Sequence, residues 1–286
     1  MAASIPLVRS VHDLRNATAH WRAAGLKIGL VPTMGALHEG HLSLIQLLRA
    51  HADKIVVSIF VNPTQFAPHE DFAAYPRTED ADLAKLALAD CDLAYVPDIT
   101  EMYPEGFSTQ VSVGPIAAPL EGTMRPHFFT GVATIVSKLL IQTTPDCAAF
   151  GEKDYQQLLV IKRMVRDLNI PTAIYGAPTQ READGLAMSS RNAYLSADER
   201  LIAGKLNRIL QDAGKRTLTG AAPDLAAAEA ADALRVAGFD SVDYVAITDA
   251  ETLEPLGQNP VTKPARILAA ARIGRTRLID NFPILP

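Results

Sequence analysis

Short apolar runs alternate with helix-like stretches over roughly the first 180 residues. The run 27–31 (KIGLV) is followed by helical spacing over 41–49, and then by the β-branched run 54–61 (KIVVSIFV). A strand, a helix and a strand in this order form a βαβ unit, whose two strands are parallel. The pattern therefore predicts a parallel sheet at the start of the chain.

The same alternation continues toward residue 168. The next expected elements are a helix with a threonine cap and an acidic first turn, a strand, a helix, a strand and a helix, over 78–91, 92–97, 131–142, 147–151 and 155–168. Apolar runs separated by helices are typical of strands buried on both faces. We predict an α/β fold with a doubly wound, Rossmann-like parallel sheet.

The pattern changes near residues 176–185. Two alanine-rich helices are expected beyond this point, followed by three strands of a small antiparallel sheet, over 196–216, 224–236, 241–247, 265–273 and 276–282. We therefore predict a Rossmann-like domain over 1–179 and a smaller α+β domain over 180–286.

Composition narrows the class of protein. The net charge of −5 and the pI near 5.8 argue against a broad basic surface for nucleic acid. No apolar run is long enough to span a membrane, and the N-terminus lacks the apolar stretch of a signal peptide. Cys91 and Cys147 lack CxxC spacing, which favours buried thiols in a reducing compartment. We expect a cytoplasmic protein that binds neither nucleic acid nor a membrane.

The stretch 32–41 (PTMGALHEGH) joins the first predicted strand to its helix. In doubly wound sheets, ligands bind beyond the carboxyl ends of the strands, where helix N-termini present free N–H groups. Gly35 and Gly40 permit tight turning and close approach of a ligand to the backbone. His38 and His41 are three residues apart, so they share a face if both lie in the first helical turn.

Spacing alone leaves the role of these histidines open. They can simply cap the helix and fill a groove. A metal site formed by His38, Glu39 and His41 is disfavoured because the HExxH spacing is absent, and no Walker loop sequence occurs in the chain.

Two later stretches carry groups suited to phosphate. Residues 151–154 (GEKD) follow an apolar strand, so Lys153 can meet a phosphate at the same sheet edge, while Gln156 and Gln157 begin the next helix. Residues 188–191 (MSSR) offer two hydroxyls and a guanidinium. The alternative is that the serines cap a helix and the arginine is a solvated surface charge.

Five stretches together resemble a known family. An HxGH motif with a later Lys/Ser-rich loop is similar to the HIGH-type nucleotidyltransferases, which adenylate carboxylates. The strings PTMGALHEGH, VSIFVNPTQF, YPRTEDADL, FGEKDYQQL and DGLAMSSRNAYLS, in this order, resemble the pantothenate synthetase (pantoate–β-alanine ligase) family in particular. Family members use ATP to join pantoate to β-alanine through an enzyme-bound pantoyl adenylate, and release AMP and pyrophosphate. The resemblance also implies a homodimer.

The resemblance implies a set of site residues. ATP contacts fall on Met34, Gly35, Ala36, Leu37, His38, Glu39, Gly40, His41, Gly151, Glu152, Lys153, Asp154, Gln180, Met188, Ser189, Ser190 and Arg191. His41 is the implied proton donor. Pantoate contacts fall on Gln65 and Gln157, and β-alanine contacts on Gln65, with Asn62 and Tyr75 nearby. Because the phosphate-donating segment 188–191 follows the domain boundary, we expect a site between the domains, with the smaller domain as its lid.

The sequence departs from the family in two places. Residues 125–132 (RPHFFTGV) stand where the family has RPGHFxGV, so His127 replaces a glycine and Phe128 a histidine. We expect the loop to keep its register through Arg125, the apolar anchor Phe129 and the turn residue Gly131. After YPRT, Asp82 is present but an alanine occupies a second acidic position, so Mg²⁺ is assigned to the ATP phosphates and to no protein ligand.

Two other functions remain as alternatives. One is another HIGH-type nucleotidyltransferase that releases an adenylated product, against which the pair Gln65 and Gln157 argues. The other is a nucleotide-binding sensor without activity, since fold alone does not fix function. The presence of His38, His41 and Lys153 argues against a sensor.

Overall fold

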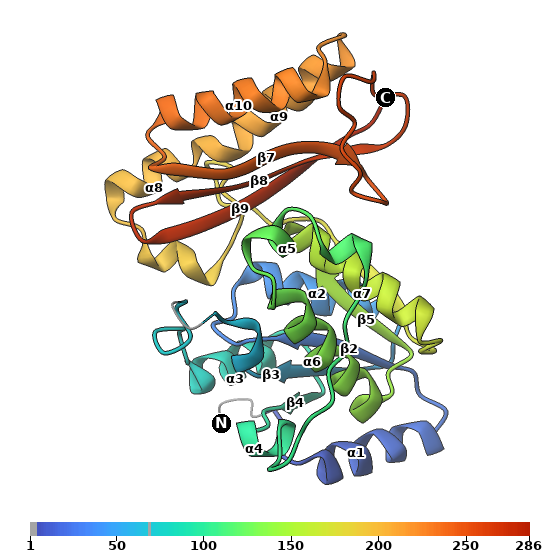
Figure 1. Ribbon diagram of the computed structural model, residues 1–286. Coiled ribbons are helices and arrows are strands. Elements are labelled where there is room, and N and C mark those ends of the chain that lie inside the picture. The colour runs from blue at the N-terminus through green and yellow to red at the C-terminus, as the bar shows by residue number, and fades with distance from the viewer. Residues whose placement is uncertain (1–4, 68–69) are drawn as a thin grey trace. The chain divides into compact units, whose positions relative to one another are not determined.

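The computed structural model describes residues 5–67 and 70–286, and the chain forms two compact units (Figure 1). The first contains the described residues up to 152 together with 157–178, and the second contains 153–156 and 179–286. No helix within the described ranges is long and apolar enough to cross a membrane.

The first unit is built on a six-stranded parallel sheet in the order β1-β4-β3-β2-β5-β6. Its strands are β1 (Leu7–Val8), β2 (Ile28–Thr33), β3 (Lys54–Ile59), β4 (Leu93–Tyr95), β5 (Cys147–Gly151) and β6 (Ala173–Ala177). Its helices are α1 (Val11–Ala23), α2 (Glu39–Arg49), α3 (Glu79–Leu88), α4 (Ile99–Met102), α5 (Glu121–Met124), α6 (Phe128–Thr143) and α7 (Tyr155–Asp167), of which α7 begins in the second unit. The predicted doubly wound parallel sheet is confirmed.

Side chains of the central strands are buried on both faces of this sheet. Leu30 of β2 belongs to a core with residues of α1, α6 and α7, whereas its neighbour Val31 belongs to a core with residues of α2 and α3. Successive strand residues point to opposite faces. Continuous apolar runs are therefore required here, which is why the sequence shows them.

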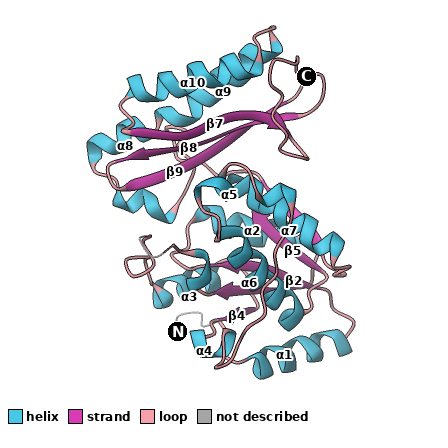
Figure 2. Cartoon of the chain, in the orientation of Figure 1, coloured by secondary structure: helices cyan, strands magenta, loops and turns pink. Residues whose placement is uncertain are grey.

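The second unit is a small α+β domain, as predicted. It contains α8 (Ala197–Ala203), α9 (Lys205–Leu218) and α10 (Pro223–Ala237), followed by β7 (Ser241–Asp249), β8 (Ala265–Ile273) and β9 (Thr276–Ile284). The strands form an antiparallel sheet in the order β7-β8-β9. Helices α9 and α10 lie along one face of this sheet and share its apolar core (Figure 2).

Several local predictions are corrected. The helix expected over 196–216 is interrupted at Gly204, which ends α8 and precedes α9; a Cβ there would lie 2.5 Å from a carboxylate oxygen of Asp184. Thr78 stands at the N-cap of α3, but its hydroxyl makes no cap hydrogen bond and donates instead to Asp82. Helix α1 was not identified from the sequence.

Candidate active site

The loop between β2 and α2 lies at the carboxyl edge of the parallel sheet. Gly35 and Ala36 both have positive φ angles, 84° and 49°, so the chain turns sharply after the strand. A Cβ on Gly35 would lie 3.1 Å from the side chain of Ile59 and 3.2 Å from Asp82. The positive φ angle therefore favours glycine here, and the space beside it is tight for any side chain.

Asp82 of α3 holds this loop in place. Its two carboxylate oxygens accept hydrogen bonds from the backbone N–H groups of Ala36 and Leu37, each at 2.8 Å. Thr78 Oγ1 donates to the same carboxylate at 3.1 Å, and Asp82 is fully buried. Lys85 Nζ donates to the carbonyl of Leu37 at 2.5 Å. Sequence reasoning noted Asp82 only as a partial family match and missed this anchoring role.

His38 and His41 lie together at the start of α2, as their spacing predicted. His38 is the N-cap residue and its Nδ1 accepts from the backbone N–H of Gly40 at 3.1 Å, while His41 Nδ1 accepts from the N–H of His38 at 3.3 Å. The ring centroids are 4.1 Å apart. Both rings therefore cap the N-terminus of α2, which was one of the two interpretations left open by the sequence. Because each Nδ1 accepts a hydrogen bond, a neutral ring carries its proton on Nε2, which is then a donor.

Gln65 follows β3 and contacts the loop that follows β2. It ends a short 3₁₀ helix, η1 (Pro63–Gln65), and its Nε2 lies 3.0 Å from Met34 Sδ. Its Oε1 accepts from Asn62 Nδ2 at 3.2 Å. The structure thus brings a residue implied for pantoate next to a residue implied for ATP. Tyr75 packs edge-on against Phe66, the residue after Gln65.

The orientation of the Gln65 amide is set by a buried network. Asn62 is 1% exposed, and its Oδ1 accepts from Tyr103 OH at 2.8 Å and from Thr64 Oγ1 at 3.0 Å. Its Nδ2 must then face Gln65 Oε1 and the carbonyl of Gly131. Gln65 therefore has its oxygen engaged and directs Nε2, a donor, away from Asn62.

The segment 125–132 supports η1. Gly131 lies in the first turn of α6, so its description as a turn residue was wrong. A Cβ at Gly131 would lie 2.5 Å from the carbonyl oxygen of Thr64 and 2.9 Å from the backbone nitrogen of Gln65. The glycine is therefore required because the backbones of α6 and η1 approach closely.

Arg125, at the other end of the segment 125–132, also contacts Gln65 of η1. Its guanidinium donates to both carboxylate oxygens of Glu70, at 2.7 and 2.8 Å, and to the carbonyl of Gln65 at 3.1 Å. The ring of Phe128 lies 3.9 Å from the guanidinium. His127 has a φ of −94° and is exposed, so a histidine adopts the backbone at the expected glycine without strain.

The other implied residues are divided between the two units. Gly151, Glu152 and Gln157 belong to the first. In the second, Lys153 and Asp154 form an ion pair at 3.6 Å. Also in the second unit, the N–H of Met188 donates to the carbonyl of Gln180 at 2.9 Å.

The capping interpretation also holds in the second unit. Ser189 is the N-cap of η4 (Ser190–Tyr194), where its hydroxyl accepts from the N–H of Arg191. This contact brings Ser189 and Arg191 together beside Met188, as the sequence placed them.

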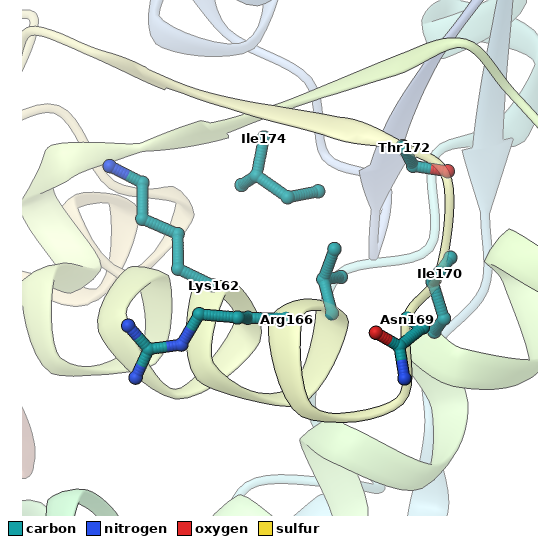
Figure 3. A pocket seen from close by; sticks show the side chains of 7 residues that line it. Lys162, Arg166, Asn169, Ile170, Thr172 and Ile174 are labelled. Atoms are coloured by element: carbon teal, nitrogen blue, oxygen red, sulfur yellow. The ribbon is translucent and has the colours of Figure 1, made fainter.

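A pocket of about 400 Å³ lies elsewhere in the first unit. Lys162 and Arg166 extend from α7 on one side, and Ile174 of β6 lies across from them (Figure 3). This pocket adjoins the amino end of β6, whereas the loops described above follow the carboxyl ends of the strands. It contains none of the implied site residues.

The cysteines are not candidates for nucleophilic chemistry. Burial raises the pKa of the Cys91 thiol to about 12 and that of Cys147 to about 11. Thiolate, the reactive form, is therefore scarce at neutral pH. Among residues 5–67 and 70–286, no group of three or more His, Cys, Asp or Glu side chains is arranged to hold a metal ion.

The parallel sheet and the loops at its carboxyl edge define a Rossmann-like α/β protein with a candidate ligand site. A sequence model of the pantoate-beta-alanine ligase family matches residues 6–283. The "Pantothenate synthetase" of Caulobacter vibrioides is 55% identical, over 97% of this chain and 98% of its own length.

Solved structures agree. The chain resembles pantothenate synthetase from Thermus thermophilus with a TM-score of 0.91 and 45% identity, over 99% of this chain and 100% of the other. It also resembles pantoate-beta-alanine ligase from Francisella tularensis, solved with β-γ ATP and β-alanine, with a TM-score of 0.82 and 35% identity, over 98% and 97% of the two chains. The chain belongs to the pantoate–β-alanine ligase family, which confirms the predicted ligase and enzyme class.

Proposed function

We propose that the chain condenses pantoate with β-alanine, using ATP, at the loops that follow β2 and β3. The observation that carries this proposal is the contact between Gln65 Nε2 and Met34 Sδ, because it joins the implied pantoate residue to the implied nucleotide loop. The β-γ ATP and β-alanine bound by the Francisella tularensis relative support the same choice of substrates.

In the first step, a carboxylate oxygen of pantoate attacks the α-phosphorus of ATP. The new O–P bond forms as the bond to the pyrophosphate oxygen breaks, which yields pantoyl adenylate and pyrophosphate. The transition state gains negative charge on the phosphate oxygens, and positioned donors and cations stabilise it without a covalent nucleophile. We assign this task to His41 Nε2–H and to Lys153; Mg²⁺ bound to the ATP phosphates would supply further positive charge there.

Mg²⁺ is best held by the nucleotide itself. Mg²⁺ commonly binds through substrate phosphates and retained waters, with few protein ligands. The Asp82 carboxylate has both oxygens occupied by backbone N–H groups, so binding Mg²⁺ would compete with the bonds that hold the loop. We therefore assign no protein ligand to the ion.

In the second step, the amine of β-alanine attacks the acyl carbon of the adenylate. The C–N bond forms as the bond between the acyl carbon and the phosphate oxygen breaks, so AMP leaves, and the proton lost by the nitrogen passes to solvent. Gln65 Nε2 and Gln157 suit pantoate because neutral amides bind its carboxylate and hydroxyl without locking the anion in an ion pair, and Gln65 also serves β-alanine. An arginine in their place would stabilise the attacking carboxylate and lower its nucleophilicity.

The remaining assignments rest on the family resemblance. It supports ATP contacts from Gly151 to Asp154, from Gln180 and from residues 188–191. It also supports a homodimer. The cytoplasmic location is instead supported by Cys91 and Cys147, which lack CxxC spacing and suit a reducing compartment. The lid role expected for the C-terminal unit stays a prediction.

Product release from the purified chain tests this proposal. Pyrophosphate release should require pantoate, and AMP release with pantothenate formation should require β-alanine as well. An adenylated product that leaves the protein without β-alanine would favour another nucleotidyltransferase. ATP binding without any turnover would favour a sensor.

A further inference from the structure

Two adjacent residues of β9 hold two separate loops of the second unit. Asp280, 2% exposed, accepts from both terminal nitrogens of Arg181, at 2.7 and 2.9 Å. Arg181 follows Gln180, and it also bridges to Ala187 in a short antiparallel pair. Asp280 thereby holds the loop that leads to residues 188–191.

Asn281 holds the second loop. Its Nδ2 donates to the backbone carbonyl of Lys153 at 2.9 Å. Its Oδ1 accepts from Arg266 Nε of β8 at 2.7 Å. An arginine has no acceptor, so Arg266 fixes the oxygen side of the Asn281 amide and leaves the NH₂ side facing Lys153.

Tyr155 provides a second set of contacts that hold residues 153–156 against the C-terminal unit's own strands and loops. Its ring lies 3.8 Å from the guanidinium of Arg266, and its hydroxyl donates to the carbonyl of Ala250 at 2.9 Å. Arg266 and Asn281 are 7% and 3% exposed, so these interactions form within the unit and not on its surface. Residues 153–156 accordingly group with the C-terminal unit although they follow β5 in the chain.

We propose that Asn281, oriented by Arg266, is a positioning residue that fixes Lys153 for its contact with the ATP phosphates. The inference rests on the proposed function, which assigns that contact to Lys153. The backbone of Lys153 is held by strands that come more than 100 residues later in the chain. The C-terminal sheet thus fixes the point from which this side chain reaches the nucleotide.

Asn281→Asp is the sharpest test of this role. The carboxylate keeps the acceptor for Arg266 but cannot donate to the carbonyl of Lys153, so that carbonyl must move. Displacing a positioned group by about 1 Å slows a reaction by roughly 10- to 100-fold, and we expect that loss in pantoate-dependent pyrophosphate release. The KM for pantoate should stay within about two-fold, because the change acts on the nucleotide side.

A double-mutant cycle separates positioning from any other effect. Lys153→Met alone should slow pyrophosphate release by about 100-fold. Adding Asn281→Asp to Lys153→Met should cost no more than about two-fold further, because the group that it positions is already gone. Asn259→Asp is the matched control, since Asn259 is an exposed asparagine of the same unit, and it should leave the rate unchanged.

A second variant covers a failure of Asn281→Asp to fold. Tyr155→Phe keeps the ring beside Arg266 and loses the hydroxyl contact to Ala250. It should give a smaller loss that also disappears in the Lys153→Met background.

Two results would overturn the inference, and they differ. If the losses of Asn281→Asp and Lys153→Met multiply, Asn281 does not act through Lys153, and the proposed function is untouched. If Lys153→Met releases pyrophosphate at the wild-type rate, Lys153 has no part in the chemistry, and both its assigned role and the inference are wrong.

Discussion

Asp82→Asn tests whether one buried carboxylate determines the shape of the β2–α2 loop. The substitution preserves size and removes the negative charge. An asparagine has one oxygen, so it can still accept from the N–H of either Ala36 or Leu37. Its NH₂ group must then face the other N–H, and two donors oppose each other in a buried place.

The expected cost follows from these contacts. A hydrogen bond to a charged group contributes about 1.5–3 kcal/mol, and a buried donor left without an acceptor costs about 1–3 kcal/mol. Loss of one such bond and weakening of the second gives about 2–4 kcal/mol of unfolding free energy for the first unit. At roughly 2–4 °C per kcal/mol for a domain of this size, the unfolding midpoint should fall by about 4–16 °C.

The same variant should also slow the first step. The loop that Asp82 holds carries Met34 and leads into His38 and His41, so its displacement should reduce pantoate-dependent pyrophosphate release by about 10- to 100-fold. Differential scanning calorimetry and the pyrophosphate assay measure the two effects on one preparation. Asp80→Asn, the same change at an exposed position two residues away, is the control. It should change neither the unfolding midpoint nor the rate of pyrophosphate release.

The reasoning fails if the two asparagine variants unfold within about 0.5 kcal/mol of each other, the usual range for surface substitutions. It also fails in part if Asp82→Asn is destabilised but keeps full activity. The carboxylate would then stabilise the fold without determining the geometry of the site.

His41→Ala should leave the fold intact and slow adenylate formation by about 100-fold or more, as expected for loss of one positioned donor; pyrophosphate release within a few-fold of wild type would remove it from the mechanism. Gln65→Ala should impair both half-reactions, whereas Gln157→Ala should chiefly raise the KM for pantoate; normal adenylate formation in Gln65→Ala would refute the shared contact. The double change His127→Gly and Phe128→His restores the family pattern and should alter activity by less than about 10-fold, or about 1.4 kcal/mol, because the backbone at 127 is unstrained. A gain or a loss of more than about 10-fold in the rate of pantothenate formation would contradict that expectation.

The elements that sequence patterns predicted are those that depend on local periodicity. The alternation at Leu30 and Val31 reports burial on both faces, and that pattern is visible in a single strand. The loop after the first predicted strand was proposed as a site for a related reason, because glycines and histidines at a strand-to-helix junction are visible without knowledge of any other segment. Capping at His38 and Ser189 is also local, and it was weighed correctly as an alternative.

The sequence could not predict which distant residue contacts each loop and fixes its position. Asp82 binds a loop 45 residues earlier in the chain, and Gly131 is a glycine because of a backbone near Thr64. The residues adjacent in sequence to Asp82 or Gly131 do not indicate which distant segment each of them contacts. A glycine in the first turn of a helix looks like a turn signal until the neighbouring backbone is known, which is why Gly131 was misread.

The dependence of these loops on distant residues has a physical consequence for the candidate site. Groups that could contact ligand, such as Met34 and Gln65, lie on short segments that cannot fix their own geometry, because a loop gains few contacts within itself. Their positions are instead set by buried polar groups, Asp82 for one segment and Asn62 for another, each with its oxygens fully used by neighbours. A buried polar group that lost one of these partners would pay the cost of an unsatisfied hydrogen bond, so each network favours a single arrangement. The geometry of the candidate site is therefore set by residues that need not touch substrate. Substitutions at Asp82 or Asn62 should affect rate and stability together, whereas those at His41 should chiefly affect the rate, because its one cap hydrogen bond to His38 contributes little to stability.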